Sequence, residues 1–222
     1  MKVLITGSAG GIGSAVAALF LEKGHSVVGI DVLPFSLEGD YIHHVADVAD
    51  ASSLPEIDGC EIVIACAGVQ NSTSACDDID VNLKGTINTV EKYAFNSAIR
   101  SVLIVASASA HTGAEFPLYS ASKGGLLSYT RNVASRLAQF GATCNSISPG
   151  GVKTDLNRPV MDNPELWNRI MDVTPLKKWA EPGEIAQWCY FLTVVNRSCS
   201  GEDILIDNGE SRLNCRFVWP GV

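Results

Sequence analysis

The sequence predicts an α/β fold, a doubly wound parallel sheet of about seven strands with helices on both faces. Short β-type runs alternate with helix-type segments from the first residue onward, which is the pattern of strands joined by crossover helices. Most runs are too apolar to have one face in water, as expected where helices cover a sheet on both sides. The first run also leads directly through a glycine-rich turn into a helical pattern.

Seven short runs are the candidate strands. They span 2–6 (KVLIT), 26–31 (SVVGID), 41–45 (YIHHV), 61–65 (EIVIA), 101–106 (SVLIVA), 142–147 (ATCNSI) and 202–206 (EDILI). Helical patterns lie between them at about 12–23, 78–95, 119–139 and 182–194, with a shorter one near 163–172. The first helix carries Ile12, Val16 and Phe20 on one stripe, and Gly24 closes it. The stretch 150–182 is a long insertion after a strand.

Composition and charge bound the class of protein. A chain of 222 residues fits one large domain and can bury a sizeable core. The net charge of −8 repels phosphate backbones and anionic headgroups, so nucleic acid and membrane are poor partners. The opening MKVLITG has too few apolar residues for a signal peptide, which favours the cytoplasm. Seven cysteines without Cys-x-x-Cys spacing indicate neither a metal site nor a disulfide framework.

The glycine-rich turn and an acidic residue after the second strand predict a dinucleotide site. Gly7, Gly11 and Gly13 allow a tight turn and close approach of a ligand, and free N–H groups at a helix start attract a pyrophosphate. The spacing departs from the common G-x-G-x-x-G pattern. Asp31 ends the next strand, where a carboxylate accepts hydrogen bonds from ribose hydroxyls. Because it would repel a 2′-phosphate and no Arg or Lys follows nearby, NAD is favoured over NADP.

Four motifs in register resemble the short-chain dehydrogenase/reductase family. They are TGSAGGIG at 6–13, VNLKG at 81–85, YSASK at 119–123 and NSISPGGVKTDL at 145–156. The resemblance implies a single Rossmann-type domain over 1–222, with strand order 3-2-1-4-5-6-7 and a substrate lid at 155–178. It also implies an oxidoreductase, working as a homodimer or homotetramer, that transfers a hydride between a nicotinamide cofactor and an alcohol or carbonyl carbon.

Tyr119 and Lys123 are the expected acid/base pair. They lie one helical turn apart, so both side chains project from the same face. A free tyrosine, with a pKa of about 10, is a poor base, and a neighbouring cation favours its phenolate. Tyr119 would accept the proton of the alcohol or donate it to the carbonyl oxygen. The resemblance implies that Lys123 also holds the nicotinamide ribose.

The catalytic hydroxyl and the remaining catalytic residue follow from the resemblance. Within IVASASAH, alignment on the strand selects Ser107, whereas alignment on the tyrosine lands on Ala106. Ser107 is favoured, with Ser109 as the reserve. Asn82 matches the family asparagine whose backbone carbonyl bends the fourth helix and binds a water on a proton relay to the lysine.

A longer set of residues is implied to contact the cofactor. These are Gly7, Gly11, Ile12, Gly13, Asp31, Asp47, Val48, Cys66, Ala67, Gly68, Tyr119, Lys123, Pro149, Gly150, Val152 and Thr154. In IACAG, Ala65 and Cys66 replace two family asparagines, which puts local stabilisation in doubt. The segments before Cys60 and before Asn82 are shorter than usual, so the chain is a trimmed version of the fold.

Two features of the sequence bear on the substrate. The apolar residues of the lid, including Leu166, Trp167 and Ile170, favour a hydrophobic or ring-shaped secondary alcohol or ketone. Packing of the lid against the body or a neighbouring subunit is an equally good explanation. In addition, SASAH around Ser107 and the short loops resemble bacterial hydroxysteroid dehydrogenases of this family. Two other functions stay open: a cofactor-binding sensor or scaffold without turnover, and an NAD-dependent epimerase or dehydratase. The apolar tail 216–222 is expected to pack against the domain or another subunit.

Overall fold

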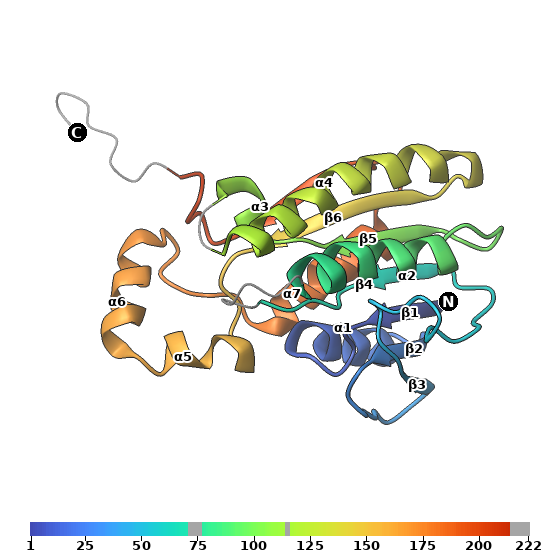
Figure 1. The fold of residues 1–222 in the computed structure, drawn as a ribbon, viewed down its shortest axis with the longest axis horizontal. Helices are drawn as coiled ribbons and strands as arrows, with labels where there is room; N and C mark the ends of the chain where they lie inside the picture. The colour runs from blue at the N-terminus through green and yellow to red at the C-terminus, as the bar shows by residue number, and fades with distance from the viewer. Residues whose placement is uncertain (71–76, 114–115, 214–222) are drawn as a thin grey trace.

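The computed structural model describes residues 1–70, 77–113 and 116–213, which form a seven-stranded sheet (Figure 1). The strands are ordered β3-β2-β1-β4-β5-β6-β7, and every neighbouring pair is parallel. The predicted fold class and strand order are therefore confirmed. The order changes direction at β1 and β4, which is where open sheets of this kind bind ligands.

The strands match the predicted runs closely. They are β1 (Lys2–Thr6), β2 (Ser26–Asp31), β3 (Tyr41–Val45), β4 (Ile62–Ala65), β5 (Ser101–Val105), β6 (Thr143–Pro149) and β7 (Asp203–Ile206). The largest difference is at β6, which continues two residues beyond the predicted end at 147. Pro149 can end this strand because its missing N–H costs no ladder hydrogen bond at a terminus.

The helices also follow the predicted segments, but the segments 78–95, 119–139 and 182–194 each divide in two. They are α1 (Gly11–Glu22), η1 (Asp78–Gly85), α2 (Thr86–Tyr93), α3 (Ser109–Thr112), α4 (Pro117–Leu137), η2 (Ala138–Phe140), η3 (Asp155–Asn157), α5 (Arg158–Met161), α6 (Pro164–Val173), α7 (Pro182–Tyr190) and η4 (Phe191–Val195). The predicted helix at 78–95 divides into the π-helical η1 and the regular α2. Gly24 closes α1 as expected, with φ of +76° and its N–H bonded to Leu21 O.

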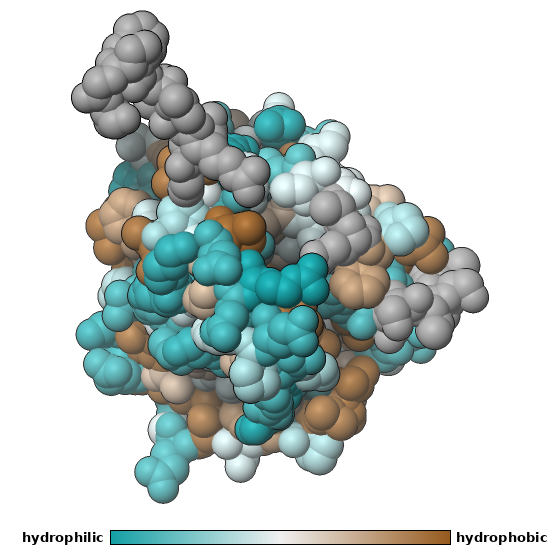
Figure 2. All heavy atoms as spheres, turned by 90° about the vertical axis from the view of Figure 1, so that its left-hand side faces the viewer, coloured by the Kyte–Doolittle hydropathy of each residue, from teal (hydrophilic) through white to brown (hydrophobic). Residues whose placement is uncertain are grey.

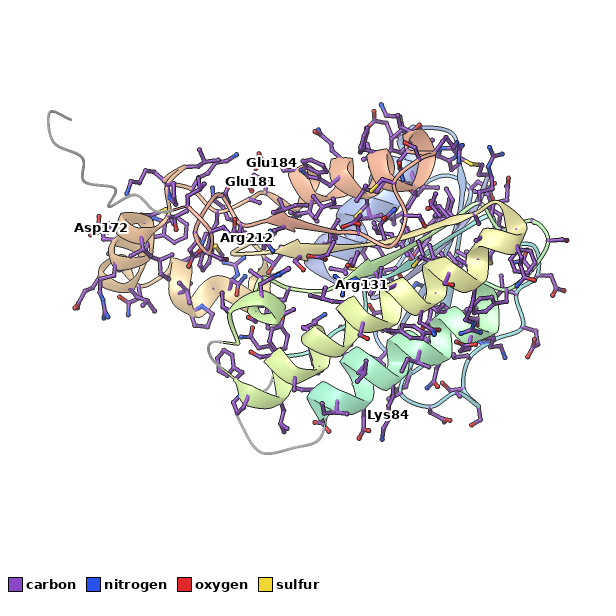
Figure 3. The ribbon with its side chains drawn as sticks, turned by 90° about the horizontal axis from the view of Figure 1, so that it is seen from above. Lys84, Arg131, Asp172, Glu181, Glu184 and Arg212 are labelled. Carbon is purple, nitrogen blue, oxygen red and sulfur yellow. The ribbon has the colours of Figure 1, made fainter. Side chains whose placement is uncertain are left out.

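Two apolar layers hold helices on opposite faces of the sheet. On one face, Leu4 and Val63 pack in a cluster with residues of α2 and α4, including Leu126. On the other, Val3 and Ile5 pack with residues of α1 and α7. Alternating residues of β1 thus point to opposite faces, and both faces are buried. Figures 1 and 3 show α2 and α4 side by side along the first face.

Between β3 and β4 the described chain forms turns and no helix. Leu54 is buried there, and Tyr93 of α2 donates a hydrogen bond from Oη to Pro55 O at 2.7 Å. The connection from β3 to β4 thus packs Leu54 against the same core as α2, although it contains no helix. The expected tail packing at 216–222 lies outside the described residues.

The helices α5 and α6 project from the body at one end of the sheet (Figure 1). Figure 2 faces this end and shows hydrophilic side chains over most of its centre, with hydrophobic ones in separate patches. Within the described ranges, no helix combines the length and apolar character needed to cross a membrane.

Candidate active site

Many of the predicted site residues lie at or just beyond the carboxyl ends of the strands. Gly7 follows β1, Cys66 follows β4, and Ser107 comes two residues after β5. Residues 150–154 follow β6, while Asp31 and Asp47 lie at or just beyond the ends of β2 and β3. Carboxyl ends of parallel strands share one edge of a sheet, so the fold gathers these segments on a single edge.

The glycine loop is built by close backbone contacts. Gly7 has φ of +69° and donates its N–H to Ile30 O at 2.8 Å. A Cβ on Gly7 would lie 2.8 Å from Ala67 Cα, and a Cβ on Gly13 would lie 2.0 Å from Gly7 O. Side chains at these positions would therefore displace backbone.

The start of α1 has no side-chain cap. Its N-cap residue Gly10 provides no side-chain hydrogen bond, so N–H groups of the first turn keep their capacity to bind an anion. Ile12 in this turn is half-buried against the α1/α7 core. The glycines and the uncapped helix form a cradle that fits the pyrophosphate of a dinucleotide.

Asp31 is tied to the glycine loop. Its carboxylate accepts one hydrogen bond from Ala9 N and another from Leu33 N, each at 3.0 Å. These bonds fix the carboxylate at the end of β2, beside the loop. Since a carboxylate has about four lone-pair sites, it can still accept hydrogen bonds from ribose hydroxyls.

A polar cluster behind the loop, formed by Ser8, Tyr41 and His43, was missed by the sequence analysis. Tyr41 Oη lies 3.2 Å from Ser8 Oγ and 2.9 Å from His43 Nδ1, and His43 Nε2 lies 2.9 Å from Leu33 O. Tyr41 covers Gly29, where a Cβ would approach its hydroxyl to 2.1 Å. The available signal was Gly29, a glycine inside an apolar strand, which often marks a close approach of other atoms.

The expected adenine-side pair, Asp47 and Val48, lies beside η1. Val48 is buried against Gly85, whose Cβ would come within 2.5 Å of Val48 Cγ2, and Asn88 Nδ2 donates to Val48 O at 2.9 Å. Asp47 is exposed and accepts a hydrogen bond from Ala49 N. Its side chain is therefore accessible while its backbone is fixed.

The segment after β4 lacks the two family asparagines and is held by hydrogen bonds from its backbone. The N–H groups of Cys66 and Ala67 both point to Thr6 Oγ1, at 3.2 and 3.3 Å. Burial raises the pKa of the Cys66 thiol to about 11, so it stays neutral. Thr6 thus supplies part of the local support that the missing asparagines would give.

Lys123 is the buried charge of the site. It is 4% exposed, and its Nζ donates a hydrogen bond to Val105 O at 2.9 Å. Burial lowers its pKa to about 8, against the opposing effects of Cys66 and Asp78. The centroid of the half-buried Tyr119 ring lies 5.8 Å from Nζ. The pair predicted from helical spacing is therefore close in space.

Asn82 lies inside the π-helix η1 and is fully buried. Its side chain accepts from Val69 N at 2.7 Å and donates to Val69 O at 2.9 Å. A Cβ on Gly68 would lie 3.1 Å from Asn82 Oδ1 and 3.2 Å from Lys123 Nζ. The structure thus brings Asn82, Lys123 and the segment after β4 together, and π-helical turns often occur at functional sites.

Ser107 and Ser109 differ in position. Ser107 is 9% exposed, and its Oγ accepts a hydrogen bond from Ser109 N at 3.2 Å. Ser109 instead begins α3. Lys123 donates a hydrogen bond to Val105 O. Ser107 is two residues from Val105 and Ser109 is four, so Ser107 is the serine nearer in sequence to this contact.

Residues after β6 return to the glycine loop. A Cβ on Gly11 would lie 2.5 Å from Thr154 Cγ2, so Thr154 covers the start of α1. Val152 is buried and bridges Ala180, and Gly150 donates its N–H to Ile206 O at 2.9 Å. From Pro149 at the end of β6, this segment therefore passes the end of β7 and reaches the start of α1.

Comparison with known proteins places these features in a family. The family model described as enoyl-(acyl carrier protein) reductase matches residues 7–211. The chain is 31% identical to 2,3-dihydro-2,3-dihydroxybenzoate dehydrogenase of Escherichia coli, over 95% of this chain and 96% of that protein. It is 28% identical to glucose 1-dehydrogenase of Gluconobacter oxydans, over 94% and 91%.

A solved structure agrees with these relatives. The short chain dehydrogenase family protein from Francisella tularensis superposes with a TM-score of 0.84 at 25% identity. The match covers 94% of this chain and 98% of that one. The similarity therefore extends over almost the full length of both chains.

Proposed function

The chain belongs to the short-chain dehydrogenase/reductase family, a family of NAD(P)-dependent oxidoreductases, and on that basis we propose that it is an NAD-dependent dehydrogenase of secondary alcohols or their ketones. The observation that carries this proposal is the buried Lys123 beside Tyr119 and Asn82 at the ligand-binding edge of the sheet. Burial of a charged lysine costs stability through desolvation, and a catalytic role for Lys123 would account for that cost.

In the proposed reaction, Tyr119 is the residue that moves the proton. When bound, the nicotinamide supplies the hydride acceptor or donor. Lys123 stabilises the tyrosinate and holds the nicotinamide ribose, and its charge has the greatest effect there because it is buried. Ser107 donates a hydrogen bond to the substrate oxygen as charge develops on it. Asn82 holds the bent η1 helix against residues 68–69, next to Lys123.

Preference for NAD over NADP is proposed from Asp31. Its carboxylate is fixed beside the glycine loop, and residues 32–40 contain no Lys or Arg to neutralise a 2′-phosphate. We expect NAD to be preferred by at least about tenfold, or about 1.4 kcal/mol, because two like charges about 4 Å apart repel by about 1–4 kcal/mol near a protein surface. The ratio of kcat/KM for the two cofactors measures this, and a preference for NADP would overturn it.

An apolar or ring-shaped substrate is proposed from the lid. Val160, Leu166, Trp167, Ile170 and Met171 are all half-buried. Trp167 packs edge-on against Trp179, with ring centroids 5.1 Å apart, so part of the apolar face does pack on the body. The name of the Escherichia coli relative describes a ring diol, which supports a ring-shaped alcohol.

Formation of NADH from a panel of secondary alcohols tests the proposed function. The panel should contain ring alcohols, hydroxysteroids, sugars and linear polyols. We expect the highest kcat/KM with ring alcohols. Tight binding of NADH without turnover of any member would overturn the proposal in favour of a sensor, and retention of cofactor without net turnover would favour an epimerase or dehydratase.

The proposed enzyme is a single domain, with 155–178 as its lid, that works as a homodimer or homotetramer in the cytoplasm. Support for association comes from the apolar surface of α7 and η4, where Trp188 and Phe191 are 40% and 47% exposed. Sedimentation analysis of the purified protein would test this, and a monomer at micromolar concentration would contradict it.

A further inference from the structure

A hydrogen-bonded chain of three charged or titratable side chains joins β7, α3 and the end of the described chain. Its members are Asp203, His111 and Arg212. His111 Nε2 lies 2.7 Å from Asp203 Oδ2, and Arg212 Nη2 lies 3.0 Å from His111 Nδ1. None of these residues belongs to the proposed catalytic or cofactor-binding set.

Asp203 is the fixed end of this chain. Its side chain is 8% exposed. Oδ1 accepts hydrogen bonds from Ser146 Oγ at 2.6 Å and Ser148 Oγ at 3.0 Å, while Oδ2 faces His111. A buried carboxylate with these partners is held in one orientation, because a rotation would break its hydrogen bonds.

The contacts assign the tautomer of His111. A guanidinium has only donors, so the Nδ1 atom that faces Arg212 must be an acceptor. The proton therefore lies on Nε2 and is donated to Asp203. The imidazole thus links Arg212 to the carboxylate of Asp203.

Arg212 is also held by its own backbone. Asp207 accepts hydrogen bonds from Gly209 N at 2.9 Å and Ser211 N at 2.7 Å, which forms the turn that precedes Arg212. The same turn is joined to the end of the lid, because Leu176 N donates to Asn208 O at 3.2 Å. The backbone that leads into Arg212 is therefore fixed, and the contact with His111 directs its guanidinium.

The position of Arg212 is at the substrate side. His111 lies four residues after Ser107, in the short helix that packs against α4, and the turn before Arg212 contacts the lid. Figure 3 shows Arg212 between the lid helices and α3. The guanidinium thus lies between two elements that border the proposed substrate site.

Arg212 is not paired with a carboxylate of the described residues. Arg136 is paired with Glu91 and Arg158 with Asp155. Arg212, by contrast, forms no ion pair within residues 1–70, 77–113 and 116–213, and its side chain is exposed. One of its five N–H groups is directed to His111, which leaves the others for a ligand.

We infer that Arg212 binds a carboxylate on the substrate, with His111 and Asp203 as the residues that position it. A guanidinium matches a planar carboxylate with two parallel hydrogen bonds. This inference rests on the proposed function and narrows its substrate class. The substrate is then an apolar or ring-shaped alcohol that carries one acidic group.

Binding of ligands that cannot react tests this inference separately from turnover. Ring carboxylates (benzoate, cyclohexanecarboxylate and 2-naphthoate) and their carboxamides would be titrated by calorimetry into the protein saturated with NADH. We expect each carboxylate to bind at least about tenfold more tightly than its carboxamide, the factor that corresponds to about 1.4 kcal/mol.

Arg212→Gln should remove this difference without changing the Kd for NADH. The matched control is Arg131→Gln, because Arg131 is also exposed but lies on α4, three turns beyond Tyr119 (Figure 3). His111→Ala should weaken carboxylate binding less than Arg212→Gln, because it removes only the positioning contact.

Carboxylates that bind no better than carboxamides, or that bind equally to the wild type and Arg212→Gln, would overturn the inference. Equal losses in Arg131→Gln would also overturn it, since they would show a general charge effect. Failure of the proposed function is a different result: NADH and ring carboxylates would bind as expected, but no alcohol in the panel would be oxidised.

Discussion

The two sides of the candidate site are constructed differently. The cofactor side is made of backbone: glycines with no room for a Cβ, an uncapped helix start and N–H groups that meet Thr6 and Asp31. The proposed substrate side depends on side chains from distant positions, including His111, Asp203 and Arg212. Backbone geometry leaves a glycine signature in the sequence, whereas side-chain contacts across about 90 residues leave none.

The backbone construction of the cofactor side predicts the largest effect. Gly13→Val would place a side chain where even a Cβ lies 2.0 Å from Gly7 O, so the loop must move. We expect NADH affinity to fall by at least about 100-fold, the loss of roughly two ion-dipole or hydrogen-bond contacts to the pyrophosphate. Fluorescence titration with NADH measures the affinity.

Gly124→Ala is the control for this substitution. Gly124 lies in α4, and nothing lies within 4 Å of its Cβ position. This change should leave NADH affinity intact and stabilise the helix by up to about 1 kcal/mol. Unchanged NADH affinity in a folded Gly13→Val protein would contradict the backbone account of the cradle.

The substrate side predicts an effect on turnover and not on cofactor binding. Ser107→Ala should reduce kcat by about 100- to 1,000-fold, because it removes a donor to the developing oxyanion. Ser109→Ala should change kcat only a few-fold, because Ser109 contributes its backbone N–H to Ser107 and that group is kept. Steady-state kinetics of both variants checks this, and equal losses would make the assignment of Ser107 wrong.

Lys123 lies between the two sides of the site, and its burial predicts that the free energy of unfolding depends on pH. Burial lowers its pKa from 10.5 to about 8, so between these values the unfolded chain binds more protons than the folded one. Stability of the cofactor-free protein should therefore rise with pH from about 8 to about 10.5, by up to about 3 kcal/mol from this residue.

Urea unfolding of the wild type and Lys123→Met at several pH values measures this contribution. The rise should be smaller in Lys123→Met, which has no proton to release. Parallel pH profiles in the two proteins would show that Lys123 is not neutralised by burial.

The smallest effect is expected for the cluster behind the glycine loop. Tyr41→Phe removes the hydroxyl that contacts Ser8 and His43 but keeps the ring over Gly29. We expect KM for NAD to rise about two- to five-fold with kcat unchanged. The lost hydrogen bonds are worth about 0.5–1 kcal/mol and support only the glycine loop, not the group that transfers the proton. A change confined to kcat would place Tyr41 in another role.

Much of the fold was predictable because it depends on local patterns. Apolar runs fixed the strands to within two residues, and the confirmed strand order followed from the family motifs. The family resemblance implied a bend at Asn82, but helical periodicity did not predict the π-helix, since a helix of 78–95 fits the same residues. The π-helix is accompanied by a tertiary contact, because the Asn82 side chain bonds both backbone groups of Val69.

The site, like the fold, has features that follow from local sequence and features that depend on tertiary contacts. Tyr119 and Lys123 were predicted to be close because helical spacing alone sets their separation, and the structure places the Tyr119 ring 5.8 Å from Nζ. The contact of Thr154 with Gly11 and the position of Arg212 depend on how the chain returns after β6 and β7. No local pattern specifies such a return, so these contacts required the structure.

The most direct test of the proposed chemistry is the comparison of Tyr119→Phe with the wild type in two measurements, NADH binding and alcohol oxidation. Phenylalanine keeps the ring beside Lys123 and removes only the group that moves the proton. We expect kcat to fall by at least about 100-fold, with a Kd for NADH that changes by less than about fivefold. Retention of wild-type kcat by Tyr119→Phe would show that Tyr119 does not transfer the proton.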